Sequence, residues 1–205
     1  MNSETQLKLV ILGKASVGKT SIINRYTKNE FEKTDVTIMA GFIRKKIFIN
    51  ENLIDFQIWD TAGQEKYRSL IPLYYKDANI AFLVYDVSDP DSFLQLKTWV
   101  KELKEKGPDN ILLFIIGNKI DLEEKVPFFE VKQYAEEIKA ILKFTSAKKD
   151  LGVEEVFNEI LMMKMLENGH KNIAELNGGK GGSKIHDIPK ENYQGYWFMN
   201  YCSLF

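Results

Sequence analysis

The sequence predicts an α/β fold in which a mostly parallel sheet of about six strands, with one antiparallel edge strand, carries helices on both faces. Short apolar runs rich in β-branched and aromatic residues alternate with longer amphipathic stretches almost throughout the chain. This alternation predicts parallel strands, because each helix carries the chain back across the sheet. One pair of runs is joined by only three polar residues, 50–52. So short a connection allows a hairpin and no crossover.

Each expected element follows from its local composition. The strand segments are short apolar runs, of which the last is the weakest: residues 7–13, 42–49, 53–60, 79–86, 111–118 and 141–147. The helical segments are the longer stretches between and after them: residues 19–28, 91–106, 128–140 and 153–166. After residue 166 the chain loses its apolar periodicity, and residues 177–183 are rich in glycine. The sequence therefore predicts one folded domain, residues 1–166, and a flexible tail, residues 167–205.

Composition and charge exclude several classes of protein. The formal net charge is -1, so general affinity for nucleic acid is not expected. The single cysteine, Cys202, allows neither an intramolecular disulfide nor a cluster of thiolate metal ligands. The polar start of the chain and the short apolar run 7–12 do not fit a signal peptide or a membrane span. We therefore expect a protein of the cytosol, or of a membrane face that meets the cytosol.

The first motif with chemical meaning runs from Gly13 to Thr20 with the spacing G-x-x-x-x-G-K-T, between a predicted strand and a predicted helix. In such a loop, backbone N–H groups and the helix N-terminus face phosphate oxygens. Lys19 offers a mobile cation to the β- and γ-phosphates, and the Thr20 hydroxyl suits Mg²⁺. A glycine-rich turn without a ligand is the alternative. The residues expected at the phosphates are Ala15, Ser16, Val17, Gly18, Lys19, Thr20 and Ser21.

Asp60 ends the strand predicted over residues 53–60 and precedes the sequence Thr-Ala-Gly-Gln-Glu. Because the carboxyl ends of parallel strands meet at one edge of a sheet, this carboxylate is expected in the same crevice as the phosphate-binding motif. Asp60 therefore suits the role of holding Mg²⁺ through water. An aspartate at a strand end is also a common turn former, which remains the alternative.

A third motif indicates which base is bound. The pattern N-K-x-D at residues 118–121 follows another buried strand. A carboxylate there accepts two hydrogen bonds from the N1–H and the 2-amino group of guanine, a pattern that adenine does not offer. The motifs together predict GTP or GDP with Mg²⁺ and disfavour an ATP-dependent enzyme. The residues expected beside the base, including those of the Thr-Ser-Ala-Lys sequence after the last strand, are Asn118, Lys119, Asp121, Ser146, Ala147 and Lys148.

With these motifs in this order, the chain resembles a small GTPase of the Ras superfamily over about residues 7–166. The branch that it resembles most is Rab, through WDTAGQEKYRSL at residues 59–70 and a tyrosine pair at residues 74–75. The helix sequence KTWVKEL at residues 97–103 is similar to the early-endosomal group of Rab proteins. The resemblance implies a P-loop NTPase G domain. It also implies a switch that hydrolyses GTP slowly to GDP and phosphate and recruits effectors to membranes in vesicle trafficking.

The resemblance assigns roles to further residues. Thr37 would bind Mg²⁺ through its hydroxyl and the γ-phosphate through its N–H, and Gly63 would donate its N–H to the same phosphate. Gln64 would orient the attacking water, while Lys19 stabilises charge on the phosphates. Phe31 would lean on the face of the guanine.

Partners are implied in the same way. Phe42, Trp59 and Tyr74 would form the aromatic triad that Rab proteins present to effectors, although Phe42 and Trp59 also fit ordinary packing in a sheet. A GTPase-activating protein is expected because the chain shows no arginine finger of its own. An exchange factor and a prenyl-binding carrier are further expected partners, and the protein itself is expected to be a monomer.

Several features depart from the Rab pattern. The segment 31–37 is one residue shorter than usual, and Met39 stands where the family has glycine. Ala15 occupies a position that is glycine in Ras. We expect Ala15 to alter hydrolysis without abolishing it. The short segment and Met39 keep an alternative open, in which the protein binds GTP without useful hydrolysis and serves as a membrane recruitment module.

The chain ends in a single cysteine within the sequence Cys-Ser-Leu-Phe, a C-a-a-X box whose last residue predicts geranylgeranylation of Cys202. A free thiol is the alternative. One lipid chain anchors only marginally, and the tail has no polybasic patch as a second signal. Five aromatic residues could supply that signal at the headgroups, or else pack on the domain or bind a partner: Tyr193, Tyr196, Trp197, Phe198 and Tyr201. We expect the cytoplasmic face of an endomembrane, endosomal by resemblance, with a cytosolic pool.

Overall fold

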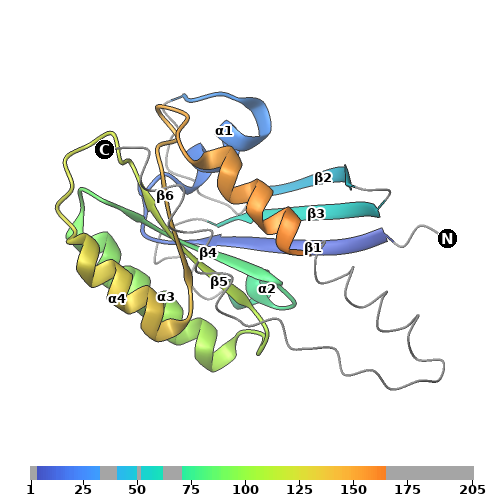
Figure 1. Ribbon diagram of the computed structural model, residues 1–205. Helices are drawn as coiled ribbons and strands as arrows, with labels where there is room; N and C mark the ends of the chain where they lie inside the picture. Colours follow the sequence, from blue (N-terminus) through green and yellow to red (C-terminus); the bar gives the residue numbers. More distant parts are fainter. Residues whose placement is uncertain (1–3, 33–40, 50–51, 62–70, 165–205) are drawn as a thin grey trace, which may run out of the picture. The chain divides into compact units, whose positions relative to one another are not determined.

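Strands and helices alternate along the chain in the computed structural model, which describes residues 4–32, 41–49, 52–61 and 71–164 (Figure 1). The strands are β1 (Glu4–Leu12), β2 (Gly41–Ile49), β3 (Asn52–Asp60), β4 (Ile80–Asp86), β5 (Leu112–Asn118) and β6 (Ile141–Thr145). The helices are α1 (Lys19–Lys28), α2 (Ile71–Tyr75), α3 (Pro90–Lys106) and α4 (Phe128–Ile138). A further helix covers residues 153–164 and is drawn in orange without a label.

The six strands form one sheet in the order β2-β3-β1-β4-β5-β6. Only the β2–β3 pair is antiparallel, with Ile49 opposite Asn52 at the hairpin, and every other pair is parallel. The predicted mostly parallel sheet with one reversed edge strand is therefore confirmed. The strand order reverses direction at β1, which lies between β3 and β4. In open α/β sheets, ligands bind outside the carboxyl ends of the strands at such a point.

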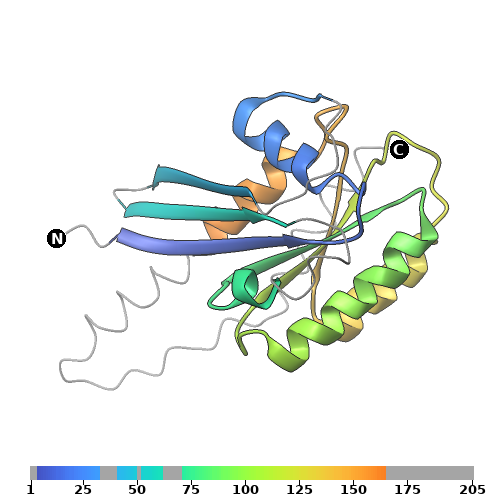
Figure 2. The same ribbon diagram turned by 180° about the vertical axis from the view of Figure 1, so that it is seen from behind.

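Helices cover both faces of the sheet, as Figures 1 and 2 show. The helices α3 and α4 lie side by side on one face, and α1 lies with the helix 153–164 on the other. The strand β4 is buried along its whole length. Its side chains alternate between the two cores: Ala81, Leu83 and Tyr85 belong to one, and Ile80, Phe82 and Val84 belong to the other. Burial on both faces thus explains why β4 is hydrophobic at every position before its last residue, Asp86.

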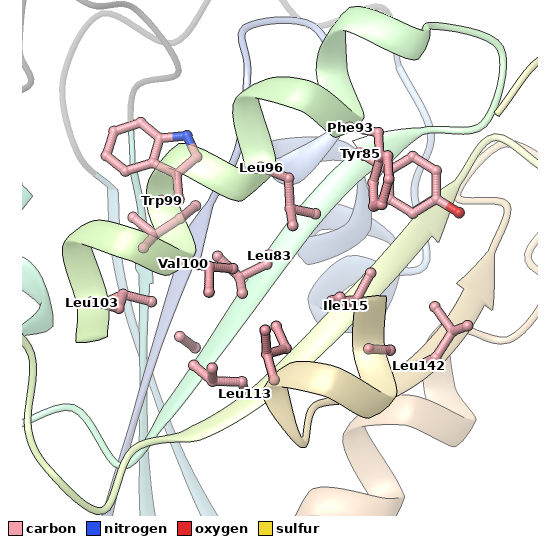
Figure 3. Close-up of a cluster of buried hydrophobic side chains, with 14 of the residues drawn as sticks. Leu83, Tyr85, Phe93, Leu96, Trp99, Val100, Leu103, Leu113, Ile115 and Leu142 are labelled. Carbon is pink, nitrogen blue, oxygen red and sulfur yellow. The ribbon is translucent and has the colours of Figure 1, made fainter. Parts of the chain in front are cut away.

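The helix α3 shows how local sequence sets an element. Asp89 caps its N-terminus by accepting a hydrogen bond from the N–H of Asp91, and Pro90 occupies the first turn, where no N–H is needed. The helix ends at Lys106, and the N–H of the following Gly107 donates to the carbonyl oxygen of Leu103. Its apolar side chains recur at helical spacing and point at the sheet (Figure 3): Phe93, Leu96, Val100 and Leu103. None of the described helices is both long and apolar enough to cross a membrane.

A few boundaries differ from the prediction. The strand β1 begins at Glu4 rather than at residue 7, because residues 4–6 pair with residues 53–55 of β3. The strand β6 ends at Thr145, since the chain then turns and Ser146 pairs with Leu151. The one-turn helix α2 was not among the predicted elements. The predicted helix 19–28 agrees with α1 at both ends.

Truncating a core side chain of α3 should destabilise the protein strongly. Leu96 is 0% exposed in the core between α3 and the sheet, whereas Leu94 is 56% exposed on the same helix. We expect Leu96→Ala to lower the free energy of unfolding by about 2–5 kcal/mol. The matched substitution Leu94→Ala should change it by less than about 0.5 kcal/mol. Denaturant titration of both variants measures this difference, and equal losses would contradict the assigned faces of α3.

Candidate functional site

The phosphate loop, residues 13–20, joins β1 to α1 at the carboxyl edge of the sheet. Gly13 has a φ of 150°, and a Cβ there would lie 2.2 Å from the carbonyl oxygen of Val84. Gly18 precedes α1 with a φ of 98°, and a Cβ there would lie 2.3 Å from Nδ2 of Asn118. Both glycines are therefore required by close packing as well as by backbone conformation. The two glycines of the G-x-x-x-x-G-K-T motif therefore stand where the phosphate loop packs against β4 and β5.

Lys19 lies along the phosphate loop. Its Nζ donates hydrogen bonds of 2.9 Å to the carbonyl oxygens of Gly13 and Lys14. The residue is 5% exposed. Burial lowers the pKa of Lys19 to about 8, although the Asp60 carboxylate opposes this shift. The buried ammonium of Lys19 donates to two carbonyl oxygens of the loop. An anion bound at the loop would therefore stabilise the positive charge of Lys19 further.

Thr20 and Asp60 offer oxygen atoms at the same edge of the sheet. The Thr20 hydroxyl donates to Oδ2 of Asp60 at 2.6 Å. Oδ1 of Asp60 is buried, and no donor in the described part of the chain reaches it. Burial raises the pKa of Asp60, against the hydrogen bond from Thr20 and the charge of Lys19. A buried carboxylate oxygen without a partner beside a hydroxyl fits Mg²⁺, which prefers hard oxygen ligands and often takes one or two carboxylates.

Asn118 ends β5 and links the phosphate loop to the end of β6. Its Nδ2 donates to the carbonyl oxygen of Val17 at 2.9 Å. Its Oδ1 accepts from the Thr145 hydroxyl at 3.1 Å and from the N–H of Ala147 at 3.4 Å. Asn118 is buried. The first residue of the N-K-x-D motif therefore has a structural role, whatever contact it makes with a base.

The rest of the base-recognition residues gather around Asp121. We call residues 118–121 the base loop. The Ser146 hydroxyl donates to Oδ1 of Asp121 at 2.5 Å, and Nζ of Lys148 lies 4.0 Å from its Oδ2. Arg25 of α1 donates from Nε to the carbonyl oxygen of Ala147 and so holds residues 145–148 in place. A carboxylate, a backbone amide and a lysine stem are thus brought to one place, as the motifs predict.

Lys119 is oriented by a residue that the motif analysis did not include. It has a left-handed backbone conformation, with a φ of 67°. Its Nζ lies 2.6 Å from Oδ2 of Asp86, the last residue of β4. Burial of Asp86 raises its pKa, but hydrogen bonds from Lys119 and Ser88 outweigh burial and hold the pKa below its usual range. Asp86 ends β4 as Asp60 ends β3. An aspartate at the end of a buried strand, the signal that identified Asp60, could therefore also have identified Asp86.

The predicted site residues fall into three groups. The phosphate loop, Asp60 and the base residues come together as described above. Phe31 lies in the described chain and is 43% exposed. Thr37, Gly63, Gln64 and Cys202 lie outside the described residues, as does Met39.

The three predicted effector residues are in mutual contact. Phe42 of β2 lies opposite Trp59 of β3 in the sheet, with ring centroids 4.8 Å apart. The rings of Trp59 and Tyr74 are 5.6 Å apart. Phe42 is 49% exposed, whereas Trp59 and Tyr74 also pack against the core on the α3 side of the sheet. The cluster therefore lies partly at the surface and partly in the packing of the sheet.

The fold and site together define a P-loop nucleotide-binding protein with a base site built for guanine. A family model described as the Ras family matches residues 8–166. The chain is 45% identical over 180 residues to Ras-related protein Rab-21 of Mus musculus, covering 86% of this chain and 80% of that protein. It is 43% identical over 183 residues to Ras-related protein Rab-31 of Rattus norvegicus, covering 88% and 91%. Rab-31 of Homo sapiens is 47% identical over 158 residues, 76% of this chain and 81% of that protein.

The chain belongs to the Ras family and, within it, to the Rab small GTPases. It is a GTPase that acts as a GTP/GDP switch in vesicle trafficking. The predicted resemblance to the early-endosomal Rab group is confirmed. Family membership does not favour the alternative of a recruitment module without hydrolysis.

Replacing Lys19 by methionine should change how stability depends on pH. Burial lowers the pKa of Lys19 from 10.5 to about 8 in the folded protein, whereas the unfolded chain keeps the ordinary value. Between these two pH values the unfolded state holds more protons, so the free energy of unfolding rises with pH. The rise is up to about 3 kcal/mol in the nucleotide-free parent.

Denaturant titration of nucleotide-free parent and Lys19→Met at several pH values from about 7 to about 10.5 measures this effect. The parent should gain stability relative to the variant across that range, because methionine carries no proton to lose. Other titrating groups, such as Tyr26 and Tyr75, are common to both proteins and cancel in the comparison. Parallel curves for the two proteins would show that Lys19 keeps its ordinary pKa in the fold.

Proposed function

We propose that GTP and GDP bind at the carboxyl edge of the sheet, with the phosphates on the phosphate loop and the guanine between the base loop and residues 145–148. The contact that carries the proposal is the hydrogen bond from Asn118 to Val17, which joins the base loop to the phosphate loop. Asp121 lies where its two oxygens meet Ser146 and Lys148, and it would accept the two donors of guanine. Phe31 would cover the guanine face.

Mg²⁺ would be held by Thr20 and Thr37, and by Asp60 through water, and would supply charge neutralisation at the β- and γ-phosphates. The buried Oδ1 of Asp60, which no donor among the described residues reaches, supports this assignment. Gln64 would orient the attacking water, and the N–H groups of Thr37 and Gly63 would contact the γ-phosphate. Lys19 would stabilise charge that develops on the phosphate oxygens in the transition state. Loss of the γ-phosphate would release both contacts and so end effector binding.

The experiment that tests these roles is single-turnover GTP hydrolysis by the full chain, loaded with GTP and Mg²⁺. We expect slow hydrolysis by the parent and at least about a tenfold loss in Gln64→Leu, because the attacking water loses its hydrogen-bond partner. Gln133→Leu makes the same substitution on the exposed face of α4 and should hydrolyse as the parent does. Equal rates for Gln64→Leu and the parent would remove the role of Gln64. Tight GTP binding without hydrolysis in the parent would instead favour the recruitment module.

We further propose that effectors bind the triad of Phe42, Trp59 and Tyr74 when GTP is bound. The exposed face of Phe42 beside the half-buried indole of Trp59 offers apolar area and aromatic edges, which are typical of interface anchors. An exchange factor, a GTPase-activating protein and a prenyl-binding carrier complete the proposed set of partners. The proposed location is the cytoplasmic face of endosomal membranes with a cytosolic pool, in line with the Rab-21 and Rab-31 relatives.

Attachment to that membrane would come from a prenylated Cys202. One lipid chain gives marginal binding, so the aromatic residues before Cys202 would add interfacial affinity. Flotation of the lipidated full chain with liposomes tests this. We expect Cys202→Ser to stay in the soluble fraction, and the double variant Trp197→Ser, Phe198→Ser to float less than the parent. Flotation of the double variant at the parent level would exclude the aromatic residues as the second signal, and flotation of Cys202→Ser would exclude the lipid.

A further inference from the structure

The connection between β4 and α3, residues 86–92, contains no nucleotide-binding motif, yet it reaches both loops of the proposed site. We call it the β4–α3 turn. The turn is internally bonded: the N–H and the hydroxyl of Ser88 donate to Oδ1 of Asp86 at 2.8 and 2.7 Å. The Ser92 hydroxyl accepts from the N–H of Asp86 at 2.9 Å and donates to the carbonyl oxygen of Asp89 at 2.6 Å. These hydrogen bonds fix the conformation of the turn and the positions of its two carboxylates, Asp86 and Asp89.

The first carboxylate holds the base loop. Oδ2 of Asp86 lies 2.6 Å from Nζ of Lys119, and Asp86 is 7% exposed. A backbone bond supports the same junction, because the N–H of Val87 donates to the carbonyl oxygen of Asn118, at the start of the base loop, at 3.0 Å. Lys119 needs such support, since a lysine in the left-handed conformation is strained.

The second carboxylate holds the phosphate loop. Oδ2 of Asp89 accepts a hydrogen bond of 2.9 Å from Nζ of Lys14. The backbone carbonyl of Lys14 is one of the two acceptors of the Lys19 ammonium. Displacing Lys14 therefore disturbs the position of the lysine that is proposed to bind the phosphates. The remaining oxygen of Asp89 caps α3 by accepting from the N–H of Asp91.

We propose that the β4–α3 turn holds the base loop through Asp86 and the phosphate loop through Asp89, and that these two carboxylates thereby set how slowly bound nucleotide leaves. Neither carboxylate is among the residues proposed to contact the nucleotide. They are positioning residues that act through Lys119 and Lys14. The inference rests on the proposed placement of GTP and GDP, and the experiment below separates the two.

The two carboxylates are not expected to contribute equally. The side chain of Asp86 is 10% exposed and that of Lys119 is 32% exposed, so the carboxylate of this charged pair is the better shielded of the two, and loss of the bond should speed nucleotide release by about tenfold. The side chains of Lys14 and Asp89 are 29% and 36% exposed. Solvent weakens this pair, and we expect release to be about two- to threefold faster without it.

The experiment measures the release of a fluorescent methylanthraniloyl-GDP from the full chain in Mg²⁺, chased with excess GDP. The variants are Asp86→Asn, Asp89→Asn and Lys14→Gln. Asparagine at residue 89 keeps an oxygen for the helix cap and removes only the charge. Asp91→Asn is the matched control, because Asp91 is exposed in the same turn and its side chain makes no ion pair with either loop in the described chain. It should release nucleotide at the parent rate.

Three further measurements distinguish positioning from general destabilisation. The double variant Lys14→Gln, Asp89→Asn should release no faster than its faster single variant, since both remove the same contact. Lys14→Arg, which keeps the cation, should restore the parent rate. The midpoint of thermal unfolding in excess GDP should be close to that of the parent for each variant.

The outcomes are separable. Failure of the parent itself to retain methylanthraniloyl-GDP would overturn the proposed nucleotide site. Retention by the parent, with Asp86→Asn and Asp89→Asn releasing at the Asp91→Asn rate, would overturn the role of the β4–α3 turn alone. Should Asp86→Asn not fold, the Lys14 and Asp89 variants decide the matter, and additive effects in their double variant would exclude the pairing.

Discussion

The buried amide of Asn118 is the contact on which the arrangement of the site depends. It joins the phosphate loop, the end of β5 and the end of β6, which are far apart in the sequence, through three hydrogen bonds. The approach is so close that residue 18 has no room for a side chain. An asparagine suits this place because its amide donates and accepts at once. The sheet brings the loops to one edge, and Asn118 fixes their distance.

The sheet itself can bring them there because its central strands are buried on both faces. Successive side chains of β4 enter opposite cores, so a slip of one residue would exchange the two sets. A fixed register in turn places the last residues of the strands: Asp60, Asp86, Asn118 and Thr145 end β3, β4, β5 and β6. Each of these polar residues takes part in the site or supports it. Core packing and site geometry are thus two results of the same strand register.

Much of this could be predicted from the sequence, because the signals are local. Apolar runs predict the strands, and the phosphate-loop and base-loop motifs predict the site residues at their spacing. The supporting contacts could not be predicted in that way. Arg25 meets residue 147 across 122 positions, and the pairing of Lys14 with Asp89 spans 75. Such pairs depend on the folded arrangement of distant segments. The one-turn helix α2 was missed because five residues give too little periodicity to detect.

The lysines of the site differ in the groups that they contact. Three lysines lie within the two nucleotide loops, and two of them are paired with carboxylates of the β4–α3 turn: Lys14 with Asp89 and Lys119 with Asp86. Lys19 donates to carbonyl oxygens, and burial lowers its pKa to about 8. A phosphate group would supply the missing negative charge at the N-terminus of α1. The β4–α3 turn thus pairs two of these lysines with carboxylates, and the third, Lys19, is the one proposed to bind the anion.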